Sequence, residues 1–206
     1  SVAKIAESQV LKWPDKLTTD SKYTQKLYKE KLDIDFDYLP SPLDVQKFNK
    51  IENVKKIENQ VAYIGRDSHE KGIDILKKAE SQINGNVVYC VDRSWEDAMR
   101  IIKSSSAVVV PSRMESLPTT IKEAFYLNVP VIATNVGGIP ELVIDNETGL
   151  LVPSENPEKL ADAVNELLSD TEKAKKLARN GNDFVKKNMT WDVILPKYIQ
   201  FYKNLL

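Results

Sequence analysis

Between residues 61 and 169, short β-branched runs alternate with segments of helical periodicity, and this alternation limits the possible folds more than any other feature. The sequence predicts strands and helices in turn, the strands at 61–65, 86–91, 106–110, 130–134 and 149–152 and the helices near 70–82, 94–104, 120–128 and 157–169. This rhythm is typical of a parallel sheet with right-handed crossovers. We therefore predict an α/β fold, a parallel sheet flanked by helices.

The chain ends in helix. Helical patterns cover 171–187 and 192–206, and Pro196 is expected to kink the second of them. A short strand is also predicted at 36–39, before the alternation begins.

Residues 107–138 predict a ligand-binding edge of the sheet. Two buried strands, Ala107–Val110 and Val131–Thr134, enclose a loop and a helix that ends near Asn128, a residue type that tolerates the left-handed conformation. Gly137-Gly138 follows the second strand. The carboxyl ends of parallel strands meet at one edge, and open α/β sheets bind ligands there.

Several short motifs follow one another in a fixed order. They are Gly65-Arg66, Lys71-Gly72, the pair Glu115 and Glu123 eight residues apart, and Gly137-Gly138. In this order and spacing the chain resembles the donor half of a GT-B glycosyltransferase of family 4, from about Ser21 to the C-terminus. The resemblance implies a Rossmann-like domain that binds a nucleotide sugar.

The resemblance also implies a division of the chain. Residues 1–31 are expected to be a remnant of, or linker from, an N-terminal acceptor domain, with helical spacing of apolar residues before Trp13-Pro14. Residues 32–188 would form the Rossmann-like nucleotide-sugar-binding domain, and 189–206 a C-terminal helix that packs back on the N-terminal domain. A length of 206 residues suits one domain or slightly more.

Composition narrows the partners and the compartment. Lys and Arg total 29 against 30 acidic residues, so net charge gives no reason to expect nucleic acid as a partner. The single cysteine, Cys90, has apolar neighbours and predicts a buried thiol in a reducing compartment. With no signal-peptide pattern or membrane-length apolar run, we predict a cytoplasmic protein; membrane contact of the complete enzyme stays open.

Arg66 and Lys71 are the candidate diphosphate ligands. Arg66 follows a strand, and Lys71 is placed in the first turn of the next helix, where a cation opposes the helix dipole. Two cations beside a helix N-terminus would stabilise a leaving diphosphate. The alternative is a pair of solvated surface cations.

Glu115 and its neighbours are the candidate sugar and phosphate contacts. The family places such a glutamate against the donor sugar, and backbone N–H groups of Ser116, Leu117 and Thr119 near the distal phosphate. Gly137-Gly138 would form a backbone nest for the same anion or for the sugar. The alternatives are a surface carboxylate and a simple glycine turn.

Glu123 has two readings. Thr120 and Glu123 fit a capping box, in which the threonine caps the helix and the glutamate reaches back to it. The resemblance instead has Glu123 accept hydrogen bonds from both ribose hydroxyls.

The base contacts are the least defined part of the site. Only one strand is predicted between Arg66 and Glu115, where the family usually has two. Val91 and Asp92, at the end of that strand, are the candidates. A UDP sugar and a GDP sugar both remain open.

No metal or cofactor is expected. Asp33-Ile34-Asp35 resembles a metal-binding pair of other glycosyltransferases but precedes a strand, and Tyr38 breaks a calcium-loop pattern. His69 has no Cys or His partner at zinc-ligand spacing.

The predicted function is the donor-binding half of a retaining glycosyltransferase that uses Arg66, Lys71 and Glu115. Without an acceptor domain, transfer by this chain alone is not expected, since catalysis needs both partners in register. The alternatives are a noncatalytic nucleotide-binding or interaction module and a GT-B sugar-nucleotide epimerase.

Overall fold

The structure is a computed structural model that describes residue 11 and residues 13–205. The helical pattern expected before Trp13 lies almost entirely outside these residues. None of the helices in the described part is long and apolar enough to cross a membrane.

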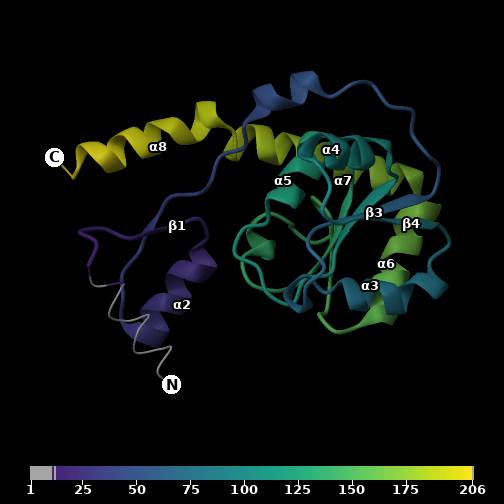
Figure 1. Cartoon of the computed structure of the whole chain (residues 1–206), viewed down its shortest axis with the longest axis horizontal. Coiled ribbons are helices and arrows are strands. Elements are labelled where there is room, and N and C mark those ends of the chain that lie inside the picture. Colours follow the sequence, from purple (N-terminus) through teal and green to yellow (C-terminus); the bar gives the residue numbers. More distant parts are fainter. Residues whose placement is uncertain (1–10, 12, 206) are drawn as a thin grey trace.

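A five-stranded parallel sheet organises the chain (Figure 1). Its strands, in spatial order, are β4 (Asn86–Cys90), β3 (Gln60–Ile64), β5 (Ala107–Val110), β6 (Val131–Thr134) and β7 (Leu150–Val152). The prediction of a parallel α/β sheet is confirmed, with each strand within one or two residues of its expected bounds. Only β4 lies between β3 and β5 in sequence, as predicted, and it forms one edge of the sheet.

Alternate residues of each strand face opposite sides of the sheet, and helices cover both sides. In β5, Val108 and Val110 face α4 (Trp95–Ser104) and α5 (Thr119–Tyr126). Ala107 and Val109 face α3 (Ile73–Ala79) and α6 (Pro157–Ser169). All four strand residues are buried, which explains the continuous apolar run.

The helical C-terminus is confirmed. Helix α7 (Thr171–Asn188) packs on α5, and α8 (Trp191–Lys203) extends beyond the sheet domain (Figure 1). Pro196 lies inside α8, and the helix continues through it without a break. Cys90 is buried, and Asn128 adopts the predicted left-handed conformation with φ 58°.

A small βαβ unit precedes the sheet domain. Strands β1 (Thr18–Thr19) and β2 (Asp37–Tyr38) pair in parallel around α2 (Lys22–Leu32), separate from the main sheet. The unit therefore extends across the expected domain boundary between residues 31 and 32, and that boundary remains a prediction.

The βαβ unit is held to the loops at the carboxyl edge of the main sheet. The carboxylate of Glu141 accepts the first two N–H groups of α2, from Lys22 at 3.0 Å and Tyr23 at 2.8 Å. Glu141 lies in the short helical turn η4 (Ile139–Glu141), directly after Gly137-Gly138. An acidic side chain at a helix N-terminus is favoured by the helix dipole.

A connector leads from this unit to β3. It contains the short helical turn η1 (Val45–Lys50) and is anchored by Lys122 of α5, which is 1% exposed. Lys122 donates hydrogen bonds to the backbone carbonyl and hydroxyl of Ser41 at 2.9 and 2.8 Å. Burial lowers the pKa of Lys122.

Candidate functional site

The chain reverses direction across the sheet at β3. From β3 it first crosses to β4 on one side, and then to β5 on the other. The loops after β3 and β5 therefore diverge, and such switch points are where open α/β sheets bind ligands. The loop after β3 carries Gly65 and Arg66, and the loop after β5 carries Glu115.

Arg66 lies exposed at the tip of β3. Its backbone carbonyl accepts a hydrogen bond from the phenol of Tyr63 at 2.7 Å, which fixes the turn. Burial raises the pKa of Tyr63 to about 12. A Cβ at Gly65 would lie 3.0 Å from the same phenol oxygen, so the turn favours glycine. Among the described residues, no ion pair engages the Arg66 side chain.

Lys71 and Glu115 meet across the switch point. The Lys71 ammonium lies 2.6 Å from Glu115 Oε1, and the hydroxyl of Ser112 donates to the same oxygen at 2.9 Å. Their side chains are 28% and 10% exposed. The cation expected to bind phosphate and the acid expected to bind sugar thus form one ion pair.

The placement of Lys71 in the first turn of a helix is wrong. Lys71 ends the short helical turn η2 (His69–Lys71), and left-handed Gly72, with φ 65°, separates it from α3. A Cβ at Gly72 would come within 2.0 Å of the Pro111 carbonyl oxygen. This close approach brings the loop after β3 against the end of β5, and Lys71 to Glu115.

Gly137 and Gly138 are needed for close packing against the loop of Glu115. A Cβ on either glycine would come within 1.9 Å of a carbonyl oxygen, that of Glu115 or that of Ser116. The N–H of Gly138 donates to the Glu115 carbonyl at 3.2 Å, so it is not free for the predicted anion nest. The N–H of Gly137 makes no hydrogen bond to a described residue.

Glu123 is held by an aromatic donor. It is 8% exposed, and the indole N–H of Trp95 donates to its Oε1 at 2.8 Å. No hydrogen bond from a described residue reaches its Oε2. Burial raises the pKa of Glu123, and the bond from Trp95 opposes that rise.

The expected capping box does not form. Helix α5 begins at Thr119, with Pro118 at the N-cap position and no side-chain cap. Thr120 therefore lies inside the helix, and Glu123 turns to Trp95 instead of the helix N-terminus. This removes the structural explanation for Glu123 that the sequence left open.

The other predicted site residues border the same edge. Ser116 bonds to the βαβ unit, with its hydroxyl 2.8 Å from that of Ser21 and 3.0 Å from that of Thr24. Leu117 is buried, and Thr119 is exposed at the start of α5. At the tip of β4, Val91 is half-buried, whereas Asp92 is exposed with φ 51°.

The Asp-x-Asp segment lies away from this edge. Asp33 and Asp35 both contact Lys29 of α2, at 2.8 and 2.9 Å. Among the described residues, no cluster of three or more His, Cys, Asp or Glu side chains is arranged for a metal ion. That the complete site works without a metal remains a prediction.

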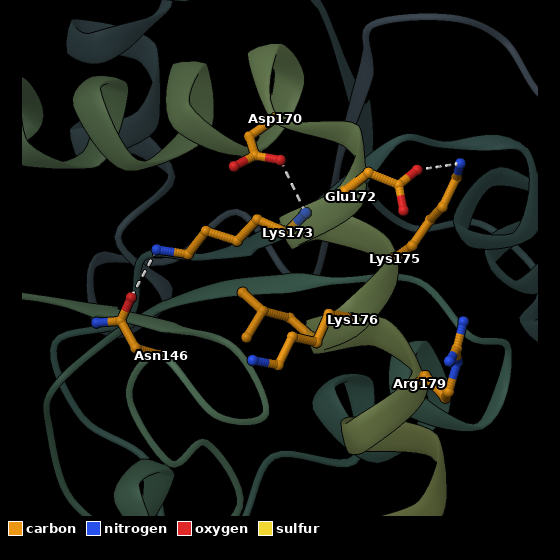
Figure 2. Close-up of a pocket in the computed structure, with 8 residues that line it drawn as sticks. Asn146, Asp170, Glu172, Lys173, Lys175, Lys176 and Arg179 are labelled. Atoms are coloured by element: carbon orange, nitrogen blue, oxygen red, sulfur yellow. Dashed lines mark hydrogen bonds and ion pairs between the residues drawn. The ribbon is translucent and has the colours of Figure 1, made fainter.

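A cavity of about 590 Å³ lies at the other end of the sheet (Figure 2). The first turns of α7 and the loop before β7 line it with mostly charged residues, among them Asn146, Lys173, Lys175, Lys176 and Arg179. Its lysines are partly neutralised, since Lys173 pairs with Glu166 and Lys175 with Glu172. It contains none of the predicted site residues.

Sequence reasoning missed three residues that organise the site: Tyr63, Trp95 and Arg113. A tyrosine in a buried strand and a tryptophan in an amphipathic helix look like ordinary core residues. Arg113, which bonds Asp74 and the carbonyl of His69, carried the clearer signal, because a charged residue three positions after a buried strand lies near the ligand-binding edge.

The fold is that of GT-B glycosyltransferases. Sucrose-phosphate synthase from Thermosynechococcus elongatus matches 98% of this chain and 61% of its own, with a TM-score of 0.85 and 23% identity. HepE of Anabaena, solved in complex with UDP and glucose, matches 98% of this chain and 66% of its own, with a TM-score of 0.84 and 17% identity. At these identities the likeness shows the fold alone.

Sequence relatives point the same way. An uncharacterized glycosyltransferase of Methanocaldococcus jannaschii is 30% identical over 167 residues, which is 69% of this chain and 47% of the relative. A GDP-mannose-dependent phosphatidylinositol monomannoside mannosyltransferase of Mycobacterium tuberculosis is 39% identical over 91 residues, 44% of this chain and 24% of the relative. The chain thus spans about half the length of these relatives or less.

The family described as glycosyl transferases group 1 matches residues 78–184. This range includes Glu115 and Glu123 together with both glycines of the loop after β6. The chain belongs to the glycosyl transferases group 1 family.

Proposed function

We propose that this chain is the donor-binding half of a retaining glycosyltransferase that transfers a hexose from a nucleoside-diphosphate sugar. The observation that carries the proposal is the contact of Lys71 with Glu115 at 2.6 Å across the switch point, with exposed Arg66 in the same loop as Lys71. Two cations at one sheet edge, Arg66 and Lys71, suit the charged diphosphate of a nucleotide sugar. The carboxylate of Glu115 suits the hydroxyl groups of its sugar.

In the proposed reaction, the bond between the anomeric carbon and the diphosphate oxygen breaks, and its electrons leave with the diphosphate. A hydroxyl oxygen of the acceptor forms the new bond to the same carbon, and its proton passes to the diphosphate. Arg66 and Lys71 stabilise this negative charge, a role that elsewhere can fall to a metal ion. For this role, Lys71 must leave Glu115 and bind the phosphate when the donor binds. Glu115 is then free to accept hydrogen bonds from hydroxyl groups of the hexose. Retention is proposed from family membership.

Glu123 is proposed to bind the ribose. Its Oε2 bears no hydrogen bond from a described residue, while Trp95 holds its Oε1 in place. A carboxylate can accept both vicinal hydroxyls. The same contact would be made by a UDP sugar and by a GDP sugar, and the names of the similar proteins include both nucleotides.

The acceptor is proposed to bind on a second domain. Helix α8 supports this, because Leu195, Ile199 and Tyr202 form an exposed apolar row at helical spacing. Next to this row, α8 borders the βαβ unit, where Tyr198, Phe201 and Tyr202 line a groove with Leu39. We propose that α8 packs on the acceptor domain, and that this chain alone binds nucleotide without transferring sugar.

The test is a titration of the 206-residue chain with UDP, GDP and ADP, followed by calorimetry and thermal shift. A ligand at about 100 times its Kd stabilises the folded state by about 2.7 kcal/mol. Arg66→Ala and Lys71→Ala should each weaken the preferred nucleotide at least about tenfold, or about 1.4 kcal/mol. Lys175→Ala, at the opposite end of the sheet, should leave affinity unchanged.

Two results would contradict the proposal. One is the absence of binding by all three nucleotides and their glucose or mannose conjugates. The other is wild-type affinity in both Arg66→Ala and Lys71→Ala. Single-turnover transfer by this chain alone would contradict only the requirement for a second domain.

A further inference from the structure

Arg113 connects three loops at the carboxyl edge of the sheet. It follows β5 by three positions, and its side chain is 13% exposed. The guanidinium reaches Asp74 of α3 and Glu155 in the loop after β7. It also donates to the backbone carbonyl of His69 at 2.7 Å. We call Arg113, Asp74 and Glu155 the arginine clamp.

The geometry of the clamp requires arginine. Two guanidinium nitrogens bond the two oxygens of Asp74, at 2.6 and 2.9 Å. Two nitrogens also engage the two oxygens of Glu155, one of them at 3.0 Å. The planar fork of arginine can serve two carboxylates at once, whereas a lysine ammonium acts as a single point charge.

The charge of Arg113 is already compensated within the clamp. Hydrogen bonds from Arg113 lower the pKa of Asp74 and of Glu155, so both acids are ionised at neutral pH. One cation thus faces two anions, and no positive charge remains for a phosphate. Any influence of Arg113 on a ligand must pass through the residues that it holds.

Two of the residues that Arg113 holds, His69 and Glu70, lie directly before Lys71. The Arg113 side chain holds the carbonyl of His69, and its backbone N–H donates to the carbonyl of Glu70 at 2.8 Å. Lys71 comes next and reaches Glu115, which lies two residues after Arg113. The loops after β3 and β5 are therefore joined by three contacts: the Arg113 side chain, the Arg113 backbone N–H and the Lys71–Glu115 pair.

We propose that Arg113 is a positioning residue that sets Lys71 for the diphosphate of the donor, with Asp74 and Glu155 fixing the arginine itself. This inference rests on the proposed function. When a phosphate draws Lys71 away from Glu115, the ion pair no longer joins the two loops. The Arg113 side chain and its backbone bond to Glu70 are then the remaining hydrogen-bonded ties between the backbone before Lys71 and the loop of Glu115.

The experiment is a double-mutant cycle on nucleotide affinity, read by calorimetry with whichever of UDP, GDP and ADP the chain binds. Arg113→Lys keeps the charge and loses the fork, and it should weaken binding about tenfold. Because Lys71 contributes only when it is held in place, Arg113→Lys should add less than about twofold to the loss in Lys71→Ala. Such non-additivity is the sign of coupled residues.

A second variant keeps the test valid if Arg113→Lys does not fold. Glu155→Gln removes one arm of the clamp at a residue whose side chain is 58% exposed, and it should give a smaller loss with the same coupling to Lys71. Arg100→Lys is the matched control, since Arg100 pairs with Asp97 at 3.3 Å within α4; it should bind as wild type.

The outcomes separate this inference from the proposed function. If the wild type binds no nucleotide, the proposed function fails and the inference fails with it. If the wild type binds and Lys71→Ala weakens binding, two results overturn the inference alone. These are wild-type affinity in a folded Arg113→Lys or Glu155→Gln variant, and losses that multiply fully with that of Lys71→Ala.

Discussion

The two halves of the candidate site are built differently. On the phosphate side, Lys71 and Glu115 form one ion pair between loops from different strands, and Arg66 is exposed without an ion pair to a described residue. The ribose side is the single acid Glu123, buried and held by one neutral donor, Trp95. The first half balances charge with charge. The second half depends on desolvation and one hydrogen bond, so it should be far more sensitive to pH.

The largest effect is expected from Gly138→Ala, which tests the loop packing of the phosphate side. Its Cβ would lie 1.9 Å from the Ser116 carbonyl oxygen and 3.0 Å from Ser21 Cβ. The loop of Glu115 must then move. We expect a loss of about 1–3 kcal/mol in the free energy of unfolding and loss of measurable nucleotide binding.

Thermal denaturation and calorimetry would check this prediction. Gly85→Ala is the control, because its Cβ would meet the Asn59 carbonyl oxygen at 2.4 Å just before β4, away from the site; it should lose stability but keep nucleotide affinity. Unchanged nucleotide affinity in Gly138→Ala would show that the loop of Glu115 does not need its present position.

The next effect concerns the ribose side. Trp95→Phe keeps an aromatic ring beside Phe48 but removes the indole donor to Glu123. That donor opposes the rise in the Glu123 pKa, so its loss should raise the pKa further. Protonated Glu123 cannot accept both ribose hydroxyls, so on acidification affinity should begin to fall at a higher pH than in the wild type.

At neutral pH we expect a loss of about fivefold to tenfold, within the range of one ordinary hydrogen bond. The loss should apply to a ribonucleotide and not to its 2′,3′-dideoxy analogue. Glu123→Gln, which cannot titrate, should show a flat pH profile. Equal losses of affinity for the ribonucleotide and its dideoxy analogue would show that Trp95 does not act through ribose binding.

The smallest effect is expected from Tyr63→Phe, which removes the hydrogen bond to the Arg66 carbonyl. We expect a loss of about 0.5–1.5 kcal/mol in the free energy of unfolding and at most about a threefold loss in nucleotide affinity. The wild-type phenol has its pKa raised to about 12, against an ordinary value near 10. It therefore favours the folded state below pH 10, and this contribution is lost as the pH rises toward 12.

Unfolding in urea at pH 8 and pH 11 would check this. The difference in stability between wild type and Tyr63→Phe should shrink or reverse at the higher pH. A difference that stays constant would mean that Tyr63 is not buried as described.

The sequence sufficed for the sheet because its central strands β5 and β6 are short apolar runs rich in β-branched residues and buried on both faces. It also placed Lys71 and Glu115 at one edge, since both follow parallel strands. The prediction from sequence failed where one side chain has two possible hydrogen-bond partners. Thr120 and Glu123 fit a capping box by spacing, yet the helix begins one residue earlier and the indole of Trp95 lies within reach.

The arginine clamp could not be derived from the sequence for a similar reason. Asp74 and Glu155 are 39 and 42 residues from Arg113, and nothing local marks them as partners. The left-handed turn at Gly72 separates Lys71 from α3. The sequence could not show this separation, because a glycine between helical patterns also occurs in simple turns.

The internal pairing of charges has a kinetic consequence. Lys71 and Arg113 are already matched by carboxylates, so among these cations only Arg66 meets an approaching anion without a paired acid in the described residues. Long-range attraction of a nucleotide should therefore be weak, and its association rate constant should fall only slightly with rising ionic strength. The dissociation rate should be the more sensitive quantity, because the ammonium of Lys71 changes partner only after the ligand has arrived.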